Sequence, residues 1–395
     1  MSLLDVVVVG AGPAGASAAF HCAKRGLKTL LIEEHAVVGE PVHCGECLSQ
    51  TAMDRMGWTL PEEAISAHVK GVRVIFPDKS SSLVTEPGYV LEKQKFEQWI
   101  VAQAQAAGAE VRLETKLTDL KREANEWKIE TSKGPLGAKV VIDASGPAAV
   151  ASRKLKLNPP KKADLPFETV TGLQYELLDI PRDDYLDFYL WPRLSPWGYL
   201  WMIPKSGTRA NVGLVTTEIP KAKVYLDQFV EEMGWKTKKK VKTFGGQIPH
   251  SGPVPHSFDE GLLLVGDAAG FTSPLFEGGT QLGLRSGQFA AQVAEKAVRQ
   301  NDFSKTVFAE YERLWKNEFP PYEKILKGKN ALYGFSDEEL NRMASLLPKE
   351  MGNLNPTDKA AVGMQLLLKH RDLMNKGAVE AFLSFGYSRA KHYGW

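Results

Sequence analysis

The sequence predicts an α/β protein, α+β overall, made of a parallel-sheet domain, a discontinuous antiparallel-sheet domain and a helical C-terminal region. Three observations support this prediction. Apolar runs that end in small-residue turns occur near residues 5–15, 139–146 and 261–270, which is typical of buried parallel strands. Short alternating runs dense in tyrosine and tryptophan fill residues 167–245. Helical periodicity dominates the chain beyond residue 300.

Composition narrows the class of protein. The chain has 395 residues, 43% of them apolar, and a net charge of +2 from 49 basic and 47 acidic side chains, a balance that gives no reason to expect nucleic-acid binding. Three cysteines are too few for a disulfide framework, which favours a reducing cytoplasm. The first strand begins almost at Met1 and no apolar run reaches the roughly 18 residues of a membrane span. We therefore expect a cytoplasmic protein, a monomer or weak oligomer, that either is free in solution or contacts the membrane surface peripherally.

The first decisive stretch is an apolar strand, Val6 to Val9, followed by a glycine-rich turn and a helix to about Arg25. In such a unit the first glycine permits the turn, the second lets the backbone approach a pyrophosphate, and the third lets the helix pack on the strand. The N–H groups at the start of the helix then bind the phosphates. The residues assigned to this site are Gly10, Gly12, Pro13, Ala14 and Gly15.

A second apolar strand, Thr29 to Ile32, ends in Glu33 and Glu34. A carboxylate about 20 residues beyond the glycines accepts hydrogen bonds from the hydroxyls of an adenosine ribose. The sequence therefore predicts a dinucleotide site without a 2′-phosphate, but this motif alone does not separate FAD from NAD.

The loop that follows contains a CxxC motif, Cys44 and Cys47, with His35 and His43 nearby. A zinc site would need four converging ligands, and the chain has no second Cys/His pair. A redox dithiol is a further alternative. The interpretation that we favour is a loop packed against the cofactor, with Cys44 as a candidate participant in chemistry.

The segment Asp143-Ala-Ser-Gly146 ends another apolar strand and should reach the same cofactor edge through Ala144 and Gly146. A further strand, 261–266, delivers Asp267 into a turn of small residues and then into a long amphipathic helix from about residue 281 to 299. A carboxylate there suits the hydroxyls of a ribityl chain, which NAD lacks. Asp267 therefore favours FAD.

The aromatic residues of the middle region have two interpretations. Tyr189, Trp191, Trp197, Tyr199 and Trp201 either form an ordinary core or line a cavity for a bulky apolar ligand. The basic run 235–242 is either a solvated face or a surface that attracts anionic lipid head groups.

Together the motifs resemble those of a known family. The three cofactor segments are similar to the FAD motifs of the flavoprotein monooxygenase superfamily. More narrowly, several segments resemble the geranylgeranyl reductase family, in particular the archaeal enzymes that saturate digeranylgeranylglycerophospholipids. These segments are Pro41-Val-His-Cys-Gly-Glu46, Gly88-Tyr-Val-Leu-Glu92 with Phe96, Pro196 to Pro204 with its YxWxxP element, Ala210-Asn-Val-Gly213 and Phe335 to Arg342.

The resemblance implies a Rossmann-like FAD-binding domain of residues 1–70, 92–160 and 246–300, a substrate domain of residues 71–91 and 161–245, and a helical domain of residues 301–395. It implies reduction of isolated C=C bonds in prenyl chains of archaeal-type ether lipids by hydride transfer from reduced FAD. Because no second GxGxxG unit follows, the electrons would come from NAD(P)H, ferredoxin or a reduced deazaflavin, the last two requiring an electron-donor partner.

The resemblance also assigns roles to residues. Cys44, Tyr199 and Trp201 would be catalytic, and His43, Tyr189, Trp191, Trp197 and Pro274 would join Tyr199 and Trp201 in binding the prenyl substrate. Cofactor contacts would include Cys44, Gly45, Lys93, Gly266, Gly278 and Gly279, with no metal. The chain departs from the family pattern at Lys93, where an arginine is usual, at Ile203, and in Ser273-Pro-Leu-Phe-Glu-Gly-Gly279, where Asp-Pro-Ile-Thr-Gly-Gly-Gly is commoner. The alternatives are an FAD-dependent monooxygenase or epoxidase acting on a lipid or quinone, a flavoprotein that passes electrons to quinone, a redox-neutral cyclase, and a binding protein.

Overall fold

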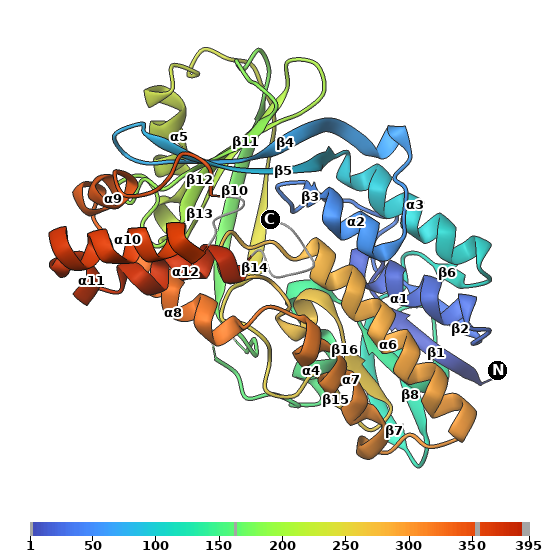
Figure 1. The fold of residues 1–395 in the computed structure, drawn as a ribbon. Coiled ribbons are helices and arrows are strands. Elements are labelled where there is room, and N and C mark those ends of the chain that lie inside the picture. The colour runs from blue at the N-terminus through green and yellow to red at the C-terminus, as the bar shows by residue number, and fades with distance from the viewer. Residues whose placement is uncertain (1–2, 162–163, 352–355, 389–395) are drawn as a thin grey trace.

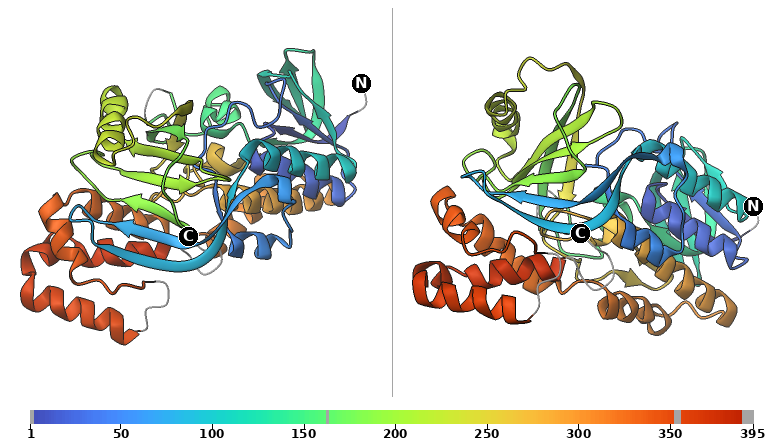
Figure 2. Two further views of the ribbon diagram at one scale, coloured as in Figure 1. Left: turned by 90° about the horizontal axis from the view of Figure 1, so that it is seen from above. Right: turned by 45° about the horizontal axis from the view of Figure 1, so that its top comes forward.

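Two eight-stranded sheets lie beside each other and are linked by long strands and helices (Figure 1). The computed structural model describes residues 3–161, 164–351 and 356–388. Among these residues, strands from residues 4–143 form most of one sheet. The other sheet combines the blue strands of residues 47–91 with the green and yellow strands of residues 169–249. The red C-terminal helices lie against the second sheet and away from the N-terminus (Figures 1 and 2).

The first sheet is mainly parallel and carries the predicted nucleotide motifs at its carboxyl edge. Its strand order is β15-β16-β9-β1-β2-β6, and the β7–β8 hairpin joins it through β8 and β9. The parallel pairs are those among β16, β9, β1, β2 and β6. The bounds are β1 Leu4–Val9, β2 Thr29–Ile32, β6 Glu110–Arg112, β7 Leu117–Glu123, β8 Glu126–Thr131, β9 Leu136–Asp143, β15 Phe258–Asp259 and β16 Leu262–Leu264.

Helices α1 (Pro13–Lys24) and α6 (Thr280–Gln300) pack against each other at very short range. A Cβ atom at Gly287 of α6 would lie 2.5 Å from the carbonyl oxygen of Ala14, so only glycine permits this contact. Helices α3 (Lys93–Ala106) and α7 (Lys305–Glu318) contribute Phe96, Phe308 and other side chains to the same core. The two cofactor-motif helices are thereby held rigidly against each other.

The second sheet is antiparallel except for the parallel pair β4–β11. Its order is β14-β10-β13-β12-β11-β4-β5-β3. The bounds are β3 Cys47–Ser49, β4 Ile65–Ile75, β5 Ser81–Leu91, β10 Thr169–Leu177, β11 Tyr185–Tyr189, β12 Tyr199–Pro204, β13 Ala210–Thr216 and β14 Lys240–Pro249.

The two faces of the second sheet are covered by different helices. Leu200 and Met202 face α5 (Ala222–Glu232), together with Phe229 of that helix. Tyr199 and Trp201 alternate with them and face the other side, in the cluster that contains the C-terminal helices. The remaining elements are α2 Gln50–Met56, α4 Val150–Lys154, α8 Tyr322–Tyr333, α9 Asp337–Ala344, α10 Pro356–Lys369, α11 Arg371–Asn375, α12 Ala378–Ser388 and the 3₁₀ helices Glu62–Ala64, Gly146–Ala148, Ile219–Lys221 and Gly266–Ala269.

Two strands cross the domain boundaries that were expected from the sequence. Strand β4 runs without a break through the expected boundary at residue 70, and β14 runs through the one at 245. Helix α7 belongs to the core of the first sheet rather than to a separate C-terminal domain, since Phe308 and Tyr311 pack there. The region after α9 contains the helices α10, α11 and α12, and residues 352–355 and 389–395 of the predicted C-terminal domain lie outside the described residues.

Candidate active site

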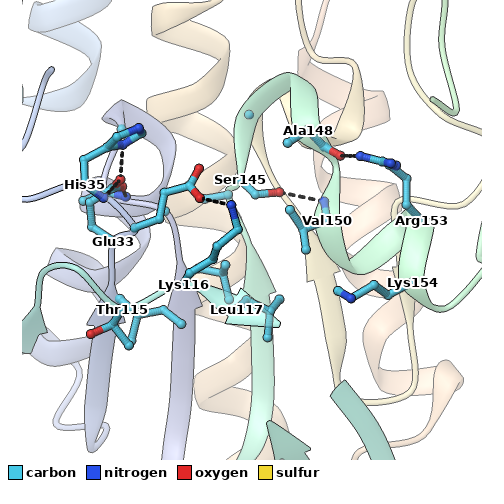
Figure 3. A pocket seen from close by; sticks show the side chains of 18 of the residues that line it. Glu33, His35, Thr115, Lys116, Leu117, Ser145, Ala148, Val150, Arg153 and Lys154 are labelled. Atoms are coloured by element: carbon cyan, nitrogen blue, oxygen red, sulfur yellow. Dashed lines mark hydrogen bonds and ion pairs between the residues drawn. The ribbon is translucent and has the colours of Figure 1, made fainter. Parts of the chain in front are cut away.

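A cleft of about 1040 Å³ opens at the carboxyl ends of β1, β2 and β9 (Figure 3). Its walls come from the glycine-rich turn, from the end of β2 and from the turn after β9. Among the residues that line it are Gly10, Gly12, Glu33, Glu34, His43, Ala144, Ser145, Gly146 and Arg153. The first two predicted cofactor motifs and the segment after Asp143 therefore meet around one cleft.

The glycine-rich turn has the shape that a pyrophosphate needs. Gly10 has a φ of +98°, and a Cβ there would lie 2.5 Å from the oxygen of Ala144. Gly12 is the N-cap of α1, makes no side-chain cap, and has open space where a Cβ would be. The start of α1 therefore has no side-chain cap, and its N-cap residue lines the cleft, as an anion site requires. Gly15 acts through packing, because its Cβ would overlap the oxygen of Gly10.

Glu33 is fixed at the mouth of the cleft by its own neighbours (Figure 3). One carboxylate oxygen accepts the N–H of Ala11 at 2.8 Å, and the other accepts the N–H of His35 at 3.0 Å and contacts the His35 Nδ1 at 2.6 Å. Glu34 pairs with Lys116 across the cleft at 2.6 Å. A carboxylate accepts up to about four hydrogen bonds, so Glu33 retains capacity for a ribose hydroxyl.

Asp143 is structural. It is fully buried, and its two oxygens accept the N–H groups of Ser145 at 3.0 Å and Ala151 at 2.8 Å. These bonds hold the turn that presents Ala144 and Gly146 to the cleft. Burial raises the pKa of Asp143, and the hydrogen bonds from Ser145 and from the backbone oppose that shift.

Asp267 and the start of α6 form a second part of the site. The Asp267 carboxylate accepts the Thr272 hydroxyl at 3.0 Å, and a Cβ at Gly279 would lie 3.3 Å from one of its oxygens. Burial raises the pKa of Asp267, whereas Thr272 and Lys93 lower it. Gly279 is the N-cap of α6 and has no side-chain cap. The Asp267 carboxylate can accept hydrogen bonds from ligand hydroxyls, and the uncapped N–H groups at the start of α6 can stabilise a negative charge.

The loop that contains Cys44 contacts the second sheet through β10 and β12. The Cys44 thiol accepts the N–H of Glu46 at 3.2 Å, and burial raises its pKa while nearby Lys93 lowers it in part. Lys93 pairs with Glu97 at 2.9 Å; burial opposes its charge, but Glu97 raises its pKa above the usual value. Buried Lys205 anchors the loop through Glu46 at 2.6 Å.

Tyr199 and Trp201 of the second sheet form a buried aromatic wall. The Trp201 indole donates to Gln174 Oε1 at 3.0 Å, and the Gln174 amide donates to the carbonyl of Cys44 at 2.7 Å. The Tyr199 hydroxyl donates to the carbonyl of Phe276, two residues before Gly278, at 2.9 Å. Tyr199 and Trp201 therefore link the Cys44 loop to the loop that opens α6.

Comparison with known proteins identifies the family to which this chain is related. A family model described as FAD dependent oxidoreductase matches residues 5–154, and one described as geranylgeranyl reductase catalytic domain matches residues 168–248. The chain is 35% identical over 366 residues to digeranylgeranylglycerophospholipid reductase of Methanocaldococcus jannaschii, covering 89% of this chain and 92% of that protein. The chain belongs to the geranylgeranyl reductase family. The Thermoplasma acidophilum relative of the same name is 33% identical, with 89% of this chain and 93% of that protein covered.

Solved structures agree on the fold of this geranylgeranyl reductase family member. A geranylgeranyl bacteriochlorophyll reductase-like protein from Thermoplasma acidophilum matches with a TM-score of 0.84 and 30% identity, over 95% of this chain and 98% of that one. A flavin-dependent brominase matches with a TM-score of 0.69 and 20% identity, over 96% and 94% of the two chains. The brominase shows a shared fold and nothing more.

The aromatic residues that were expected to bind the substrate do not all lie on the same face of the sheet. Tyr189 and Trp191 lie on the opposite face of the sheet, packed against Phe229 of α5, so the structure corrects their assignment. The reason is strand register: Phe188 pairs with Trp201, so Tyr189 points the other way. Trp197 is 51% exposed in the turn before β12.

Other predicted residues lie at the edges of the site. His43 is exposed at the nucleotide cleft, and its Nδ1 contacts the carbonyl of Gly245 at 2.6 Å. Pro274 is buried in the loop before α6. Gly45 packs on the sheet, where its Cβ would lie 3.2 Å from Ile203. Gly266 lies under Ala14, since a Cβ there would come within 2.8 Å of the alanine methyl.

Sequence reasoning missed Gln174 and Glu277. Gln174 carries no motif, and its place beside Cys44 depends on the register of β10 with β13. Glu277 had a signal, because it stands where the family usually has glycine. Among the described residues, no group of three or more His, Cys, Asp or Glu side chains is arranged to hold a metal, and no helix has the length and hydropathy to cross a membrane.

Proposed function

We propose that this chain is an FAD-dependent reductase that saturates isolated C=C bonds of geranylgeranyl chains, with archaeal-type ether lipids as substrates. Family membership and the relatives named as digeranylgeranylglycerophospholipid reductases support the activity. The observation that carries the proposal is the aromatic wall of Tyr199 and Trp201, hydrogen-bonded to both flanks of the cofactor site. An apolar aromatic wall in direct contact with cofactor-binding segments suits a long prenyl chain.

The residues present fit FAD. The uncapped start of α1 would hold the pyrophosphate, Glu33 the ribose, Asp267 the ribityl hydroxyls, and the N–H groups at Gly279 the pyrimidine edge. When reduced, the bound group supplies a hydride to one alkene carbon. Tyr199 and Trp201 would hold the chain in place and keep water from the reacting carbons.

Cys44 is one candidate for the donor of the proton that the other alkene carbon needs. Its thiol lies at the flank of the site, and because burial raises its pKa, it is neutral at physiological pH. A Cys44→Ala variant that keeps near-normal single-turnover reduction would refute this role. The electron donor is external in this proposal and is NAD(P)H, ferredoxin or a reduced deazaflavin.

The test of the activity is product analysis. The FAD-loaded protein is incubated with excess dithionite and a digeranylgeranyl glycerophospholipid under argon, and the lipid is measured by mass spectrometry. The proposal predicts a gain of two hydrogens for each alkene reduced. A lipid that keeps its mass under argon and gains ¹⁸O when ¹⁸O₂ is admitted would instead identify a monooxygenase.

We also propose a peripheral contact with the cytoplasmic face of the membrane through α10 and α12. Met364, Leu367 and Leu368 of α10 and Leu383 of α12 are exposed, Leu368 by 72%. The cationic Lys369 ends α10, and Arg371 begins α11. Apolar side chains beside cations suit an anionic bilayer surface.

Vesicle sedimentation tests this contact. The wild-type protein should bind vesicles of phosphatidylglycerol more strongly than vesicles of phosphatidylcholine, and a Leu367→Glu/Leu368→Glu variant should lose binding while it keeps bound FAD. Equal binding of the variant and the wild type would contradict the proposal.

A further inference from the structure

Glu277 occupies an unusual place in the loop that opens α6. It directly precedes Gly278 and Gly279, and both Phe276 (φ 62°) and Glu277 (φ 47°) have left-handed backbone conformations. Its Oε2 atom is buried, and within the described structure it has no hydrogen-bond partner. An unsatisfied buried polar atom destabilises the folded state, and strained backbone is found disproportionately at functional sites. The arrangement therefore calls for a functional explanation.

The groups that face Glu277 come from two elements. Tyr199 approaches from β12, and Lys329 and Tyr333 approach from α8. Burial raises the pKa of Glu277 to about 7, although Lys329 and Tyr199 act in the opposite direction. Burial disfavours the charged form of an amine as well, and it therefore lowers the pKa of Lys329. An acid with such a pKa holds its proton for part of the time at neutral pH and releases it readily.

A row of groups leads from Glu277 toward solvent. Lys329 is buried, and its Nζ is hydrogen-bonded to Nδ1 of His250. The same Nζ donates to the backbone carbonyl of His250 at 3.1 Å. His250 Nε2 lies 4.0 Å from a carboxylate oxygen of Glu168, whose side chain is 61% exposed. Glu168 and Glu277 also act on the charge of Lys329. These groups connect Lys329 to solvent, and Lys329 lies close enough to Glu277 for each to act on the charge of the other.

We propose that Glu277 is a catalytic acid of the alkene reduction and that Lys329 and His250 return its proton from solvent. This inference rests on the proposed function, which supplies the alkene and the hydride. The alkene π bond breaks, one carbon takes the hydride and the other takes the carboxyl proton of Glu277. The substrate gains two electrons, and Glu277 is left as a carboxylate that Lys329 reprotonates.

The position of Glu277 favours this role. It lies next to the residues proposed to face the cofactor and contacts Tyr199 of the aromatic wall. The other candidate acid, Cys44, lies at the opposite flank of that wall, linked to it through Gln174. Burial raises the pKa of the Cys44 thiol above its usual value near 9, so it is a weaker acid than Glu277 at neutral pH.

The first test is infrared spectroscopy of the oxidised, FAD-loaded protein, without turnover. A protonated carboxyl band that disappears as pH rises through about 7 should be present in the wild-type protein and absent in Glu277→Gln. It should persist in the matched control Glu318→Gln, because the Glu318 carboxylate pairs with Arg55 and Arg285. A wild-type spectrum identical to that of Glu277→Gln between pH 5 and 9 would show a permanently ionised partner of Lys329 and overturn the proposal.

The second test is kinetic. In wild-type protein the single-turnover rate should fall as pH rises through about 7, and Glu277→Gln should lower it about 100-fold or more and remove this dependence. Lys329→Met should keep a fast single turnover at pH 6 but slow multiple turnover. Should Glu277→Gln lose FAD, Glu277→Asp serves in its place, with a displaced pH midpoint expected. A wild-type protein that gives no saturated product refutes the proposed function, whereas product formation at an unchanged rate in the variant refutes only the role of Glu277.

Discussion

Removal of Lys205 tests how the Cys44 loop is held. The Lys205 and Glu46 side chains are 3% and 4% exposed, and their charged atoms lie 2.6 Å apart. In Lys205→Met the Glu46 carboxylate stays buried without its cation, and loss of one partner of a buried pair costs about 3–5 kcal/mol. Glu46 keeps bonds from Asn211 at 2.6 Å and from the backbone of Lys93 at 3.1 Å. We therefore expect the lower end, about 3 kcal/mol.

Urea unfolding of the FAD-loaded protein measures this loss. The matched control is the double variant Lys205→Met/Glu46→Gln, in which no buried charge remains at this pair. Because apolar or neutral groups of similar size tolerate burial, the double variant should be more stable than the sum of the single variants predicts, by about 1–3 kcal/mol. A Lys205→Met protein within about 1 kcal/mol of wild type, or strictly additive single variants, would refute the argument.

Two further predictions concern other parts of the fold. A Cβ at Gly213 would lie 2.5 Å from the Trp201 ring, so Gly213→Val should displace the indole. The variant should lower the rate of prenyl reduction about tenfold or more while it keeps the flavin absorbance. Unchanged activity would contradict the role of Trp201 in holding the prenyl chain. Burial and the nearby cations Arg25, Lys24 and Arg285 lower the pKa of His21 to about 3. An unfolded histidine takes up a proton below about pH 6.5, so unfolding free energy should fall by about 3 kcal/mol from pH 7 to pH 4 at this residue. His21→Leu should show a smaller fall in urea titrations, and an equal fall would contradict this.

The nucleotide half of the site could be predicted from the sequence because its chemistry is local. Gly10, Gly12 and Glu33 lie within one strand-turn-helix-strand unit, so their spacing alone brings them together. Asp267 lies far along the chain, but it too follows a buried parallel strand, and such strands end at one edge of the sheet.

The substrate half could be predicted only in part because it depends on register between strands. Alternation along β12 places Tyr199 and Trp201 on one face, but whether Tyr189 shares that face depends on how β11 pairs with β12. The effect of Lys329 on the charge of Glu277 relates helix α8 to the loop before α6, two segments that no sequence period connects. Tertiary packing therefore decided the residues that local pattern could not.

The measurement that tests the central claim most directly is an anaerobic single turnover. The FAD-loaded protein is reduced with one equivalent of dithionite, excess reductant is removed, and a geranylgeranyl lipid is added while flavin absorbance and lipid mass are followed. The account predicts that the flavin reoxidises under argon as the lipid gains two hydrogens per flavin. A flavin that stays reduced until air is admitted, with oxygen then found in the lipid, would contradict it.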